Sequence, residues 1–570
     1  MNTTISIGNQ SFEKIRESNS FYIDKTGFIR EWWENRDDVT LITRPRRFGK
    51  TLNMSMLECF FSQKYAGRGD LFEGLSIWED KEYQKLQGTY PVIFMSLAGV
   101  KAGSYRGAKD GIVKAVANVY DAHSYLKDSG VLSKEECSNF DAFQNYSVNP
   151  SPYKEIADSV VAAALQTLSM YLERFHHKKA LIILDEYDTP IQEAFVSNYW
   201  KDLIEFMREL FNLTFKENKK MERGILTGIT RVSRESVFSD LNNLEVITTT
   251  SEKYCTAFGF TETEVRASLE QFGLGDMGEK VRCWYDGFRF GSVTNIYNPW
   301  SITKYLDAKR FGTYWANTSS NRLISKLIRE SDKDIKIAVE DLLKGRTIET
   351  AIDEEIVFDQ LEESNEAIWS LLLASGYLKV DSLSETDDED DVVYHLALTN
   401  LEVKKEFYRT IQSWFKKSSI RYNDFVKALL SGHVGYMNQY MNQMVLSVFS
   451  FFDSGTHPSN QAEPERFYHG FVLGLIADAK LDYVISSNRE SGLGRYDVVM
   501  EPRDKHDMAY VLEFKVKDSD CENTLEETVE NALAQIEDKK YDEMLIERGI
   551  PKERIRHYGF AFEGKKVLIG

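Results

Sequence analysis

The sequence has few cysteines and no long hydrophobic run, and each absence excludes a class of protein. Its five cysteines are an odd number, lie far apart and form no CxxC pair or Cys/His cluster, which argues against a disulfide framework and a zinc site. No apolar segment reaches the roughly 18 residues that a membrane-spanning helix needs, and residues 1–20 lack the apolar core of a secretion signal. We therefore expect a cytoplasmic protein with no membrane partner.

The chain also lacks an excess of basic residues over acidic ones. The net charge of −19 argues against a nucleic-acid coat protein and a polybasic membrane binder. Any contact with DNA or RNA would therefore depend on a local basic surface. A chain of 570 residues has room for about three or four domains, so large hydrophobic cores are available.

The first motif with a chemical meaning is Gly49-Lys50-Thr51. An apolar strand candidate at residues 39–42 precedes it, and a helical pattern follows. Strand, tight loop and helix start together aim backbone N–H groups at the phosphates of a nucleotide. Lys50 would then reach the β- and γ-phosphates, and the Thr51 hydroxyl would bind Mg²⁺. The alternative is a surface turn at the basic start of a helix.

The loop departs from the full phosphate-loop pattern. That pattern has a glycine five residues before Gly49, and Arg44 occupies the position in this chain. Arg46 and Arg47 add two further cations, which predicts a modified phosphate cradle with extra positive charge. The predicted nucleotide-binding residues of the loop are Arg44, Arg46, Arg47, Phe48, Gly49, Lys50 and Thr51.

A second motif places two carboxylates at the end of a strand. Residues 180–184 are an apolar run typical of a buried parallel strand, and Asp185 and Glu186 follow it. Asp185 can hold Mg²⁺ through water, and Glu186 can orient the water that attacks a γ-phosphate. An ordinary strand followed by a polar loop is the alternative. The order of the two motifs, more than a hundred residues apart, favours a P-loop ATPase.

Three further segments complete the predicted N-terminal and middle regions. Residues 224–232 form another buried strand candidate that ends in polar groups, expected beside the carboxylate strand, with Arg231 or Thr230 at its tip near the γ-phosphate. A polar loop after a core strand explains either residue equally well. Asp24 and Lys25 are predicted to be a cap and a solvated charge rather than part of the nucleotide pocket. The middle region is predicted to be mainly helical.

The C-terminal part carries an independent set of charged residues. Two strand candidates, residues 495–500 and 509–516, are joined by a turn-rich segment. The period of two puts Glu513 and Lys515 on one face, and a paired strand can bring Asp497 beside them. A strand with alternating charges on its surface is the alternative.

Two carboxylates and one ammonium group suit metal-dependent cleavage of a phosphodiester. Asp497 and Glu513 would bind Mg²⁺ or Mn²⁺, and Lys515 would orient the attacking water or stabilise the developing charge. Glu465, on a predicted helix upstream, can supply a further carboxylate ligand. Gln535 and Tyr541 lie on a predicted helix downstream.

With these residues together, the chain resembles a prokaryotic family that joins an AAA-ATPase-like N-terminal region to a C-terminal domain of the PD-(D/E)XK nuclease superfamily. The arginine-rich loop is itself typical of that family, and the resemblance implies ATP binding, ATP hydrolysis and a nuclease fold. The segments that carry it are residues 22–26, 43–51, 71–75, 184–188, 227–231, 285–288, 467–471, 494–497, 513–515 and 534–536.

We therefore predict an α/β protein with three domains: a P-loop ATPase sheet flanked by helices (1–255), a mainly helical lid or linker (256–430) and a nuclease-like, restriction-endonuclease-like domain (431–570). The predicted function is an ATP-binding ATPase coupled to a Mg²⁺-dependent nuclease acting on DNA or RNA. The alternative is a nucleotide-dependent switch whose C-terminal domain binds a partner or nucleic acid without cleavage. The sequence is compatible with an oligomer.

Overall fold

The chain folds into two compact units, which we describe separately. The first contains Met1–Arg329 and Gly345–Glu406, and the second contains Glu330–Lys344 and Phe407–Gly570. The computed structural model describes all residues except 1–3, 149–155, 231–237, 239–240, 316–326, 329–332, 353–363, 386–391, 417–421, 449–471, 474, 477–481, 492–493, 519–520 and 564–565.

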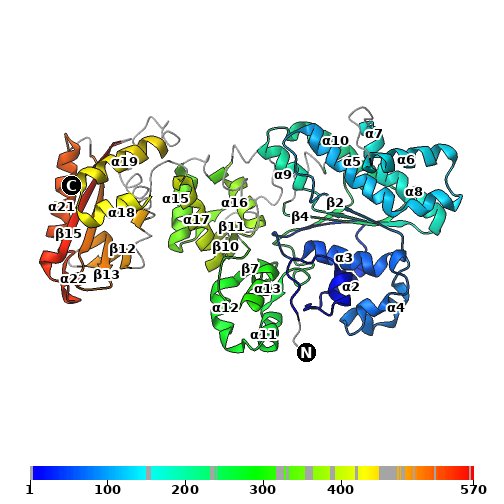
Figure 1. Cartoon of the computed structure of the whole chain (residues 1–570), viewed down its shortest axis with the longest axis horizontal. Coiled ribbons are helices and arrows are strands. Elements are labelled where there is room, and N and C mark those ends of the chain that lie inside the picture. Colours follow the sequence, from blue (N-terminus) through cyan, green and yellow to red (C-terminus); the bar gives the residue numbers. More distant parts are fainter. Residues whose placement is uncertain are drawn as a thin grey trace. The chain divides into compact units, whose positions relative to one another are not determined.

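A five-stranded parallel sheet organises the first unit (Figure 1). Its strands, in spatial order, are β2 (Val92–Ser96), β3 (Ala180–Asp185), β4 (Met221–Gly228), β1 (Val39–Thr43) and β5 (Leu244–Ile247). Every residue of β1 and β3 is buried, as expected for strands covered on both faces. Because all five strands are parallel, their carboxyl ends meet at one edge, where the phosphate loop and the two carboxylates follow β1 and β3.

Helices cover both faces of this sheet (Figure 1). Alternation along β3 divides the core, since Ile182 and Leu184 belong to one hydrophobic cluster and Leu181 and Ile183 to the other. The helices on the first face are α5 (Tyr105–Ala122), α6 (Lys134–Val148), α7 (Asp158–Ala162), α8 (Ala164–His176), α9 (Thr189–Val196) and α10 (Trp200–Phe211). Those on the second face are α1 (Phe12–Glu17), α2 (Gly27–Asn35), α3 (Lys50–Phe61) and α4 (Lys81–Leu86).

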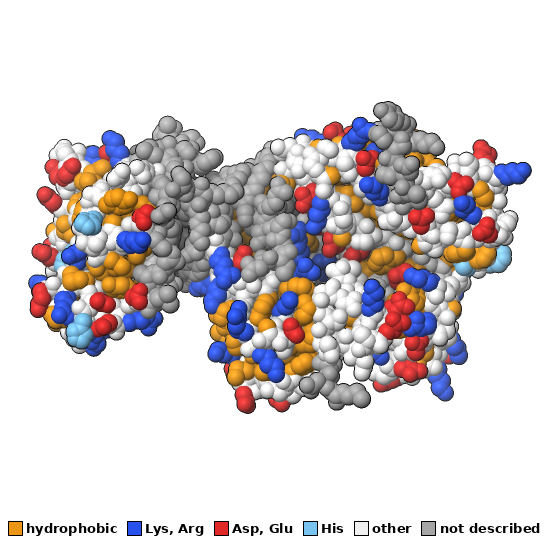
Figure 2. Space-filling view, in the orientation of Figure 1, with side chains coloured by type: hydrophobic (Ala, Val, Ile, Leu, Met, Phe, Trp, Pro, Cys, Tyr) orange, Lys and Arg blue, Asp and Glu red, His pale blue; other side chains and the backbone are white. Residues whose placement is uncertain are grey.

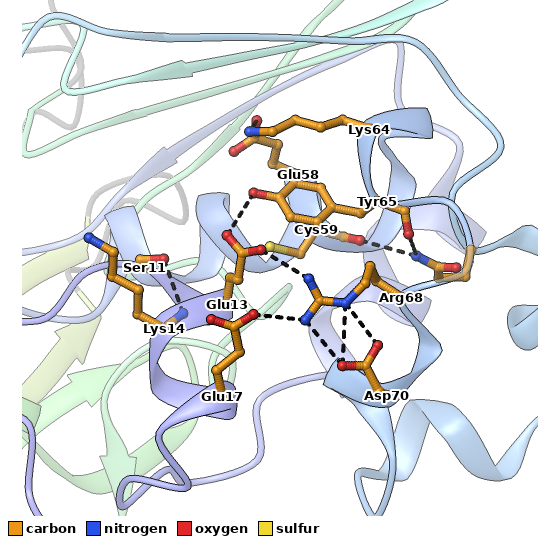
Figure 3. A network of polar contacts seen from close by, with 11 residues as sticks. Ser11, Glu13, Lys14, Glu17, Glu58, Cys59, Lys64, Tyr65, Arg68 and Asp70 are labelled. Carbon is orange, nitrogen blue, oxygen red and sulfur yellow. Dashed lines mark hydrogen bonds and ion pairs between the residues drawn. The ribbon is translucent and has the colours of Figure 1, made fainter.

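The short helix α1 is fastened to the second face by packing and by charge. The Phe12 ring stacks on Phe72 at 5.1 Å between centroids. The Arg68 guanidinium donates to Glu13 at 3.2 Å and to Glu17 at 2.9 Å, so it joins two carboxylates of the helix, and it also pairs with Asp70 (Figure 3). Because residues 5–10 come directly before α1, this anchor fixes the N-terminal segment beside the phosphate-loop helix.

The rest of the first unit combines helices with two small antiparallel sheets. One has the order β6 (Phe260–Thr261), β8 (Val293–Tyr297), β7 (Asp286–Phe290), and the other β10 (Leu378–Glu385), β11 (Val392–Leu398), β9 (Ile348–Thr350). A capping box formed by Thr261 and Glu264 is present at the start of α11. The helices of this part are α11 (Glu262–Gln271), α12 (Gly278–Tyr285), α13 (Pro299–Ala308), α16 (Asn365–Ala374) and the start of α17 (Leu401–Lys416).

The second unit is built on a mixed five-stranded sheet. Its strands, in order, are β12 (Tyr483–Ser491), β13 (Gly494–Pro502), β14 (Ala509–Val516), β15 (Ile555–Glu563) and β16 (Lys566–Ile569). Only the β14–β15 pair is parallel. One face packs on α18 (Tyr422–Ser431) and α19 (Val434–Val448), the other on α21 (Leu525–Asp538) and α22 (Glu543–Glu547), and α15 (Lys333–Lys344) also belongs to the unit.

These two sheets confirm the predicted α/β class: a parallel sheet flanked by helices near the N-terminus and a mixed sheet domain at the C-terminus. Within the described part of the chain, no helix has both the length and the apolar character needed to span a bilayer.

Candidate functional site

The phosphate loop connects β1 to α3 with the geometry that the sequence predicts. Helix α3 begins at Lys50, and its N-cap Gly49 has a left-handed backbone with φ of 83°. Arg47 is also left-handed, with φ of 65°, which costs a residue with a side chain roughly 1 kcal/mol or more. A non-glycine residue held in this conformation at the start of a helix marks a loop whose shape is imposed by its surroundings.

The two predicted motifs meet through a direct hydrogen bond. Thr51 Oγ1 donates to Asp185 Oδ2 at 2.9 Å, and Thr227 Oγ1 donates to the other oxygen of the same carboxylate at 2.6 Å. β4, which carries Thr227, pairs with both β1 and β3 and therefore sets their spacing. Asp185 is fully buried, and this burial raises the pKa of its carboxyl group.

The Lys50 ammonium group is buried under the loop. It donates to the carbonyl oxygens of Arg44 at 2.6 Å and Pro45 at 2.9 Å. Burial lowers the pKa of Lys50 to about 8, and the nearby carboxylates of Glu186, Asp188 and Asp185 oppose that shift. Lys50 and Asp185 are thus close enough to interact electrostatically, as a nucleotide site requires.

A cavity of about 380 Å³ opens beside these residues, and its lining has two chemically distinct parts. The polar part contains the loop from Arg46 to Thr51 together with Glu186. The apolar part contains Ile5, Ile7, Phe21, Phe260 and Trp300. Charged groups for a polyphosphate and aromatic or aliphatic surface for a base therefore line one cavity.

Glu186 stands where a water-orienting carboxylate is predicted. Its backbone is left-handed, with φ of 53°, and its N–H donates to Thr227 Oγ1 at 3.3 Å. Its Oε2 accepts a hydrogen bond from Thr189 Oγ1 at 3.0 Å. This arrangement turns the side chain into the cavity directly after the buried Asp185.

The three loop arginines have different surroundings. Arg44 is fully buried and does not line the cavity; its guanidinium donates to the carbonyls of Thr43 and Thr248 and lies 4.4 Å from the Phe290 ring centroid. Burial lowers the pKa of Arg44 to about 9. Although we predicted that Arg44 would contact the nucleotide, the structure places it in the packing behind the loop.

Arg46 and Arg47 do line the cavity. Arg46 donates to Gln192 Oε1 at 3.0 Å, and the Arg47 guanidinium lies 4.4 Å from the Trp300 ring centroid. Phe48 also belongs to the lining, but most of its ring is buried against Phe288 at 4.7 Å. Both arginines are therefore within the site, and Phe48 fixes the loop to the neighbouring sheet.

Two predicted site residues, Arg231 and Glu465, lie outside the described residues. The neighbouring candidate Thr230 is described; it is hydrogen-bonded to Asp188 and does not line the cavity. Asp188 accepts hydrogen bonds from the N–H groups of Ile229 at 2.8 Å and Thr230 at 3.2 Å. The Asp188 carboxylate therefore holds the two residues directly after β4, and burial raises the pKa of Asp188.

In the second unit, the structure brings Asp497, Glu513 and Lys515 together. The antiparallel register of β13 and β14 pairs Val498 with Leu512. One residue beyond this pair, Asp497 on β13 and Glu513 on β14 are next to each other. At that point Asp497 Oδ2 accepts the N–H of Phe514 at 2.9 Å. Alternation along β14 sends Leu512 and Phe514 into one core cluster and leaves Glu513 and Lys515 on the opposite face, as predicted.

Gln535 on α21 connects two of these side chains. Its Oε1 accepts from the Lys515 ammonium at 2.8 Å, while its Nε2 donates to Glu513 Oε1 and to the Tyr541 hydroxyl at 3.3 Å. Burial raises the pKa of Tyr541, and the carboxylates of Glu513 and Asp497 add to that shift. These charged and polar groups therefore form one cluster between β14 and α21.

The donor sets fit Mg²⁺ in both units. Among the residues that the structure describes, no three His, Cys, Asp or Glu side chains gather as a metal-binding group. Mg²⁺ keeps several waters and needs only one or two carboxylates plus substrate phosphates. Asp497 with Glu513 provides such a pair, and Thr51 with Asp185 provides a hydroxyl and a carboxylate.

The described part of the second unit's face in Figure 2 gives no strong signal for nucleic acid. On the face of the second unit that Figure 2 shows, acidic and basic side chains are interspersed, and its described residues form no continuous basic area there. Any nucleic-acid contact on this face would therefore depend on a few local cations rather than on a broad field.

Sequence reasoning missed several residues of these sites. Lys25, predicted to be solvated, lines the cavity and pairs with Glu264 at 2.7 Å. Residues 5–10 also line the cavity and carry no motif. The sequence predicts no role for Gln535. Its place on the helix that follows the strand of Glu513 and Lys515 is the feature that could have indicated one.

Comparisons with known proteins find separate matches for the N-terminal and C-terminal parts of the chain. A family model for a predicted AAA-ATPase matches residues 6–238, and a model for the PD-(D/E)XK nuclease superfamily matches residues 463–570. An uncharacterized protein in the vnfD 5' region of Azotobacter chroococcum mcd 1 is 25% identical over 552 residues, covering 96% of this chain and 94% of that protein. As predicted, the N-terminal part of the chain matches a predicted AAA-ATPase model and its C-terminal part matches a model of the PD-(D/E)XK nuclease superfamily.

Proposed function

We propose that the first unit binds and hydrolyses ATP. The observation that carries this proposal is the 2.9 Å hydrogen bond from Thr51 to Asp185, next to Lys50 and Glu186 at one cavity. Lys50 and the N–H groups at the start of α3 would bind the β- and γ-phosphates. Bound Mg²⁺ would supply positive charge to the phosphate oxygens. Glu186 would orient the attacking water.

For the second unit, the proposed reaction is hydrolysis of a phosphodiester bond in DNA or RNA. Asp497 and Glu513 would hold Mg²⁺ or Mn²⁺, which would supply Lewis acidity at the phosphate. Lys515 would orient the water or stabilise the negative charge that develops on the phosphate. Gln535 holds the Lys515 ammonium and the Glu513 carboxylate side by side, at 2.8 Å from the ammonium.

We expect ATP to control cleavage, and one experiment tests the whole proposal. Labelled DNA and RNA are incubated with the full chain and Mg²⁺ or Mn²⁺, with and without ATP. Cleavage that changes with ATP supports a nucleotide-controlled nuclease. If neither substrate is cut under any condition, and ATP changes only binding, the second unit acts as the non-cleaving switch instead.

Replacing Lys50 by alanine is expected to abolish measurable ATP binding, because a buried ammonium beside the phosphates is lost and two loop carbonyls lose their donor. We expect the affinity to fall at least about 100-fold, which corresponds to a charge-assisted contact of roughly 3 kcal/mol. Isothermal titration calorimetry measures this. Lys81→Ala, on the exposed start of α4, is the control and should bind ATP like the wild type. Unchanged binding by Lys50→Ala would contradict the proposal.

The affinity for ATP is also expected to depend on pH. The pKa of Lys50 is lowered to about 8 in the free protein, and a bound polyphosphate favours the charged amine, so binding raises that pKa. Below pH 8 the amine is already charged and the affinity is constant. As pH rises above 8, binding must take up a proton, and the affinity falls by up to about tenfold per unit. Titration calorimetry between pH 7 and 9.5 measures the slope, which Lys50→Arg should flatten.

A further inference from the structure

Three consecutive backbone carbonyl groups of the phosphate loop, those of Arg44, Pro45 and Arg46, accept hydrogen bonds from side chains. Lys50 occupies the carbonyls of Arg44 and Pro45. The carbonyl of Arg46 accepts two hydrogen bonds, from Trp315 Nε1 at 2.9 Å and from Asn298 Nδ2 at 3.2 Å. These two donors come from a part of the chain about 250 residues after the loop, and they bind its central peptide.

We infer that Asn298 and Trp315 are positioning residues for nucleotide binding: they hold the Arg46 carbonyl away from the cavity and so keep the N–H of the same peptide, that of Arg47, turned toward the phosphates. A peptide group is planar, so fixing its carbonyl on one side fixes the next N–H on the other. The inference rests on the proposed ATP-binding function of the first unit and adds residues that no phosphate-loop motif contains.

The composition of the loop explains why it needs external donors. The position that holds glycine in the full pattern is Arg44, and Arg47 adopts a left-handed backbone that disfavours any side chain. Trp300 offsets part of that cost by packing its ring 4.4 Å from the Arg47 guanidinium. Trp300 is at the start of α13, where Asn298 is the N-cap, so one helix start binds the loop at two neighbouring residues.

Asn298 is suited to this role because the oxygen and the nitrogen of its side-chain amide bind different parts of the chain. Its side-chain oxygen accepts the N–H groups of Trp300 at 2.9 Å and Ser301 at 3.4 Å, which caps α13. Its side-chain nitrogen donates to the Arg46 carbonyl. The helix start and the loop are therefore tied to each other by one amide.

Trp315 is itself fixed by packing and by a buried carboxylate. Its ring lies 6.0 Å from Phe288 and 5.2 Å from Tyr377. Its backbone N–H donates to Glu402 Oε1 at 2.6 Å, and Ser301 donates to Oε2 of the same side chain at 2.7 Å. Glu402 is 1% exposed, so this carboxylate joins α13 to the residue that carries the indole donor.

Two substitutions remove one donor each and keep the rest of the contact. Trp315→Phe retains an aromatic ring between Phe288 and Tyr377 but has no N–H. Asn298→Asp retains the oxygen that caps α13 but cannot donate to the Arg46 carbonyl. We expect each to weaken ATP binding about five- to tenfold, as the loss of one hydrogen bond predicts, and the double variant about 50-fold. Competition against a fluorescent ATP analogue measures the affinities.

The affinity for inorganic tripolyphosphate separates a loop effect from general damage to the cavity. Tripolyphosphate has no base, so we expect its affinity to fall by the same factor as that of ATP in both variants. The melting temperature of the nucleotide-free protein should stay within about 2 °C of the wild-type value. Trp284→Phe is the matched control, because Trp284 packs on Phe311 at 5.6 Å, and it should bind both ligands like the wild type.

The outcomes distinguish this inference from the proposed function. If the wild type binds ATP and Lys50→Ala does not, but Trp315→Phe and Asn298→Asp both bind like the wild type, the two residues do not position the loop. A loss of ATP affinity with unchanged tripolyphosphate affinity would also overturn the inference, since the damage would then lie at the base. If the wild type itself binds no ATP, the proposed function fails first.

Discussion

Replacing Glu186 by glutamine is expected to lower ATP hydrolysis by roughly two to three orders of magnitude while ATP affinity stays within a factor of about three. Glutamine preserves the size of the side chain and can still accept the hydrogen bond that Thr189 donates at 3.0 Å. It cannot act as a base or orient water through a negative charge. The rate of phosphate release at saturating ATP measures the first effect, and calorimetry measures the second.

Glu193→Gln provides a matched control for this prediction. Glu193 lines the same cavity from α9, so its substitution changes the charge of the cavity by the same amount. It does not follow the buried Asp185, and we expect the hydrolysis rate to stay within about threefold of the wild-type rate. If Glu186→Gln hydrolyses ATP at the wild-type rate, Glu186 does not orient the water. If both variants lose activity equally, the total charge of the cavity matters rather than the position of Glu186.

The backbone of Glu186 supports this assignment beyond its position in the motif. A left-handed backbone with φ of 53° is unfavourable for a glutamate, and such conformations gather at functional sites. The cost is offset by two hydrogen bonds around the residue, from its own N–H to Thr227 and from Thr189 to its carboxylate. Thr227 also donates to Asp185, so one hydroxyl contacts the Asp185 carboxylate and the backbone N–H of Glu186.

Local sequence patterns were sufficient to predict the elements that hold the candidate site residues. A buried apolar run ending in Asp185 and a loop ending in Lys50 and Thr51 specify two strand ends, and parallel pairing brings such ends to one edge of the sheet. In the second unit the period of two along β14 was enough to place Glu513 and Lys515 on one face. In both cases the geometry follows from regular secondary structure alone.

The features that the sequence does not predict, the burial of Arg44 and the contact of Gln535 with Lys515, depend on packing between distant segments. Arg44 is buried by Phe290 and Phe258, more than 200 residues away, and a cation in a phosphate loop gives no sign of such a burial. Gln535 reaches Lys515 because α21 packs closely on the sheet; a side-chain carbon at Gly559 of β15 would meet the Val529 carbonyl at 2.9 Å. Neither contact has a periodic signature in the sequence.

In the second unit, Asp497→Asn, Glu513→Gln and Lys515→Ala are each expected to lower nucleic-acid cleavage by at least about 1,000-fold, because each removes a charge that, in the proposed reaction, would bind the metal or stabilise the attacked phosphate. We expect the first two substitutions to preserve the fold. Asparagine still offers an oxygen to the Phe514 N–H, and glutamine still offers one to Gln535. Cleavage of end-labelled DNA and RNA in Mg²⁺ or Mn²⁺ measures the rates.

The control for the lysine lies two residues further along the chain. Lys517 also carries an ammonium, but it pairs with Glu563 at 2.7 Å instead of contacting Gln535. Lys517→Ala should therefore cleave within about threefold of the wild-type rate, while Lys515→Ala is inactive. Equal rates for Lys515→Ala and the wild type would show that the observed cleavage does not use this cluster. ATP hydrolysis by all these variants should match the wild type, because Asp497, Glu513 and Lys515 belong to the second unit and the predicted ATPase residues to the first.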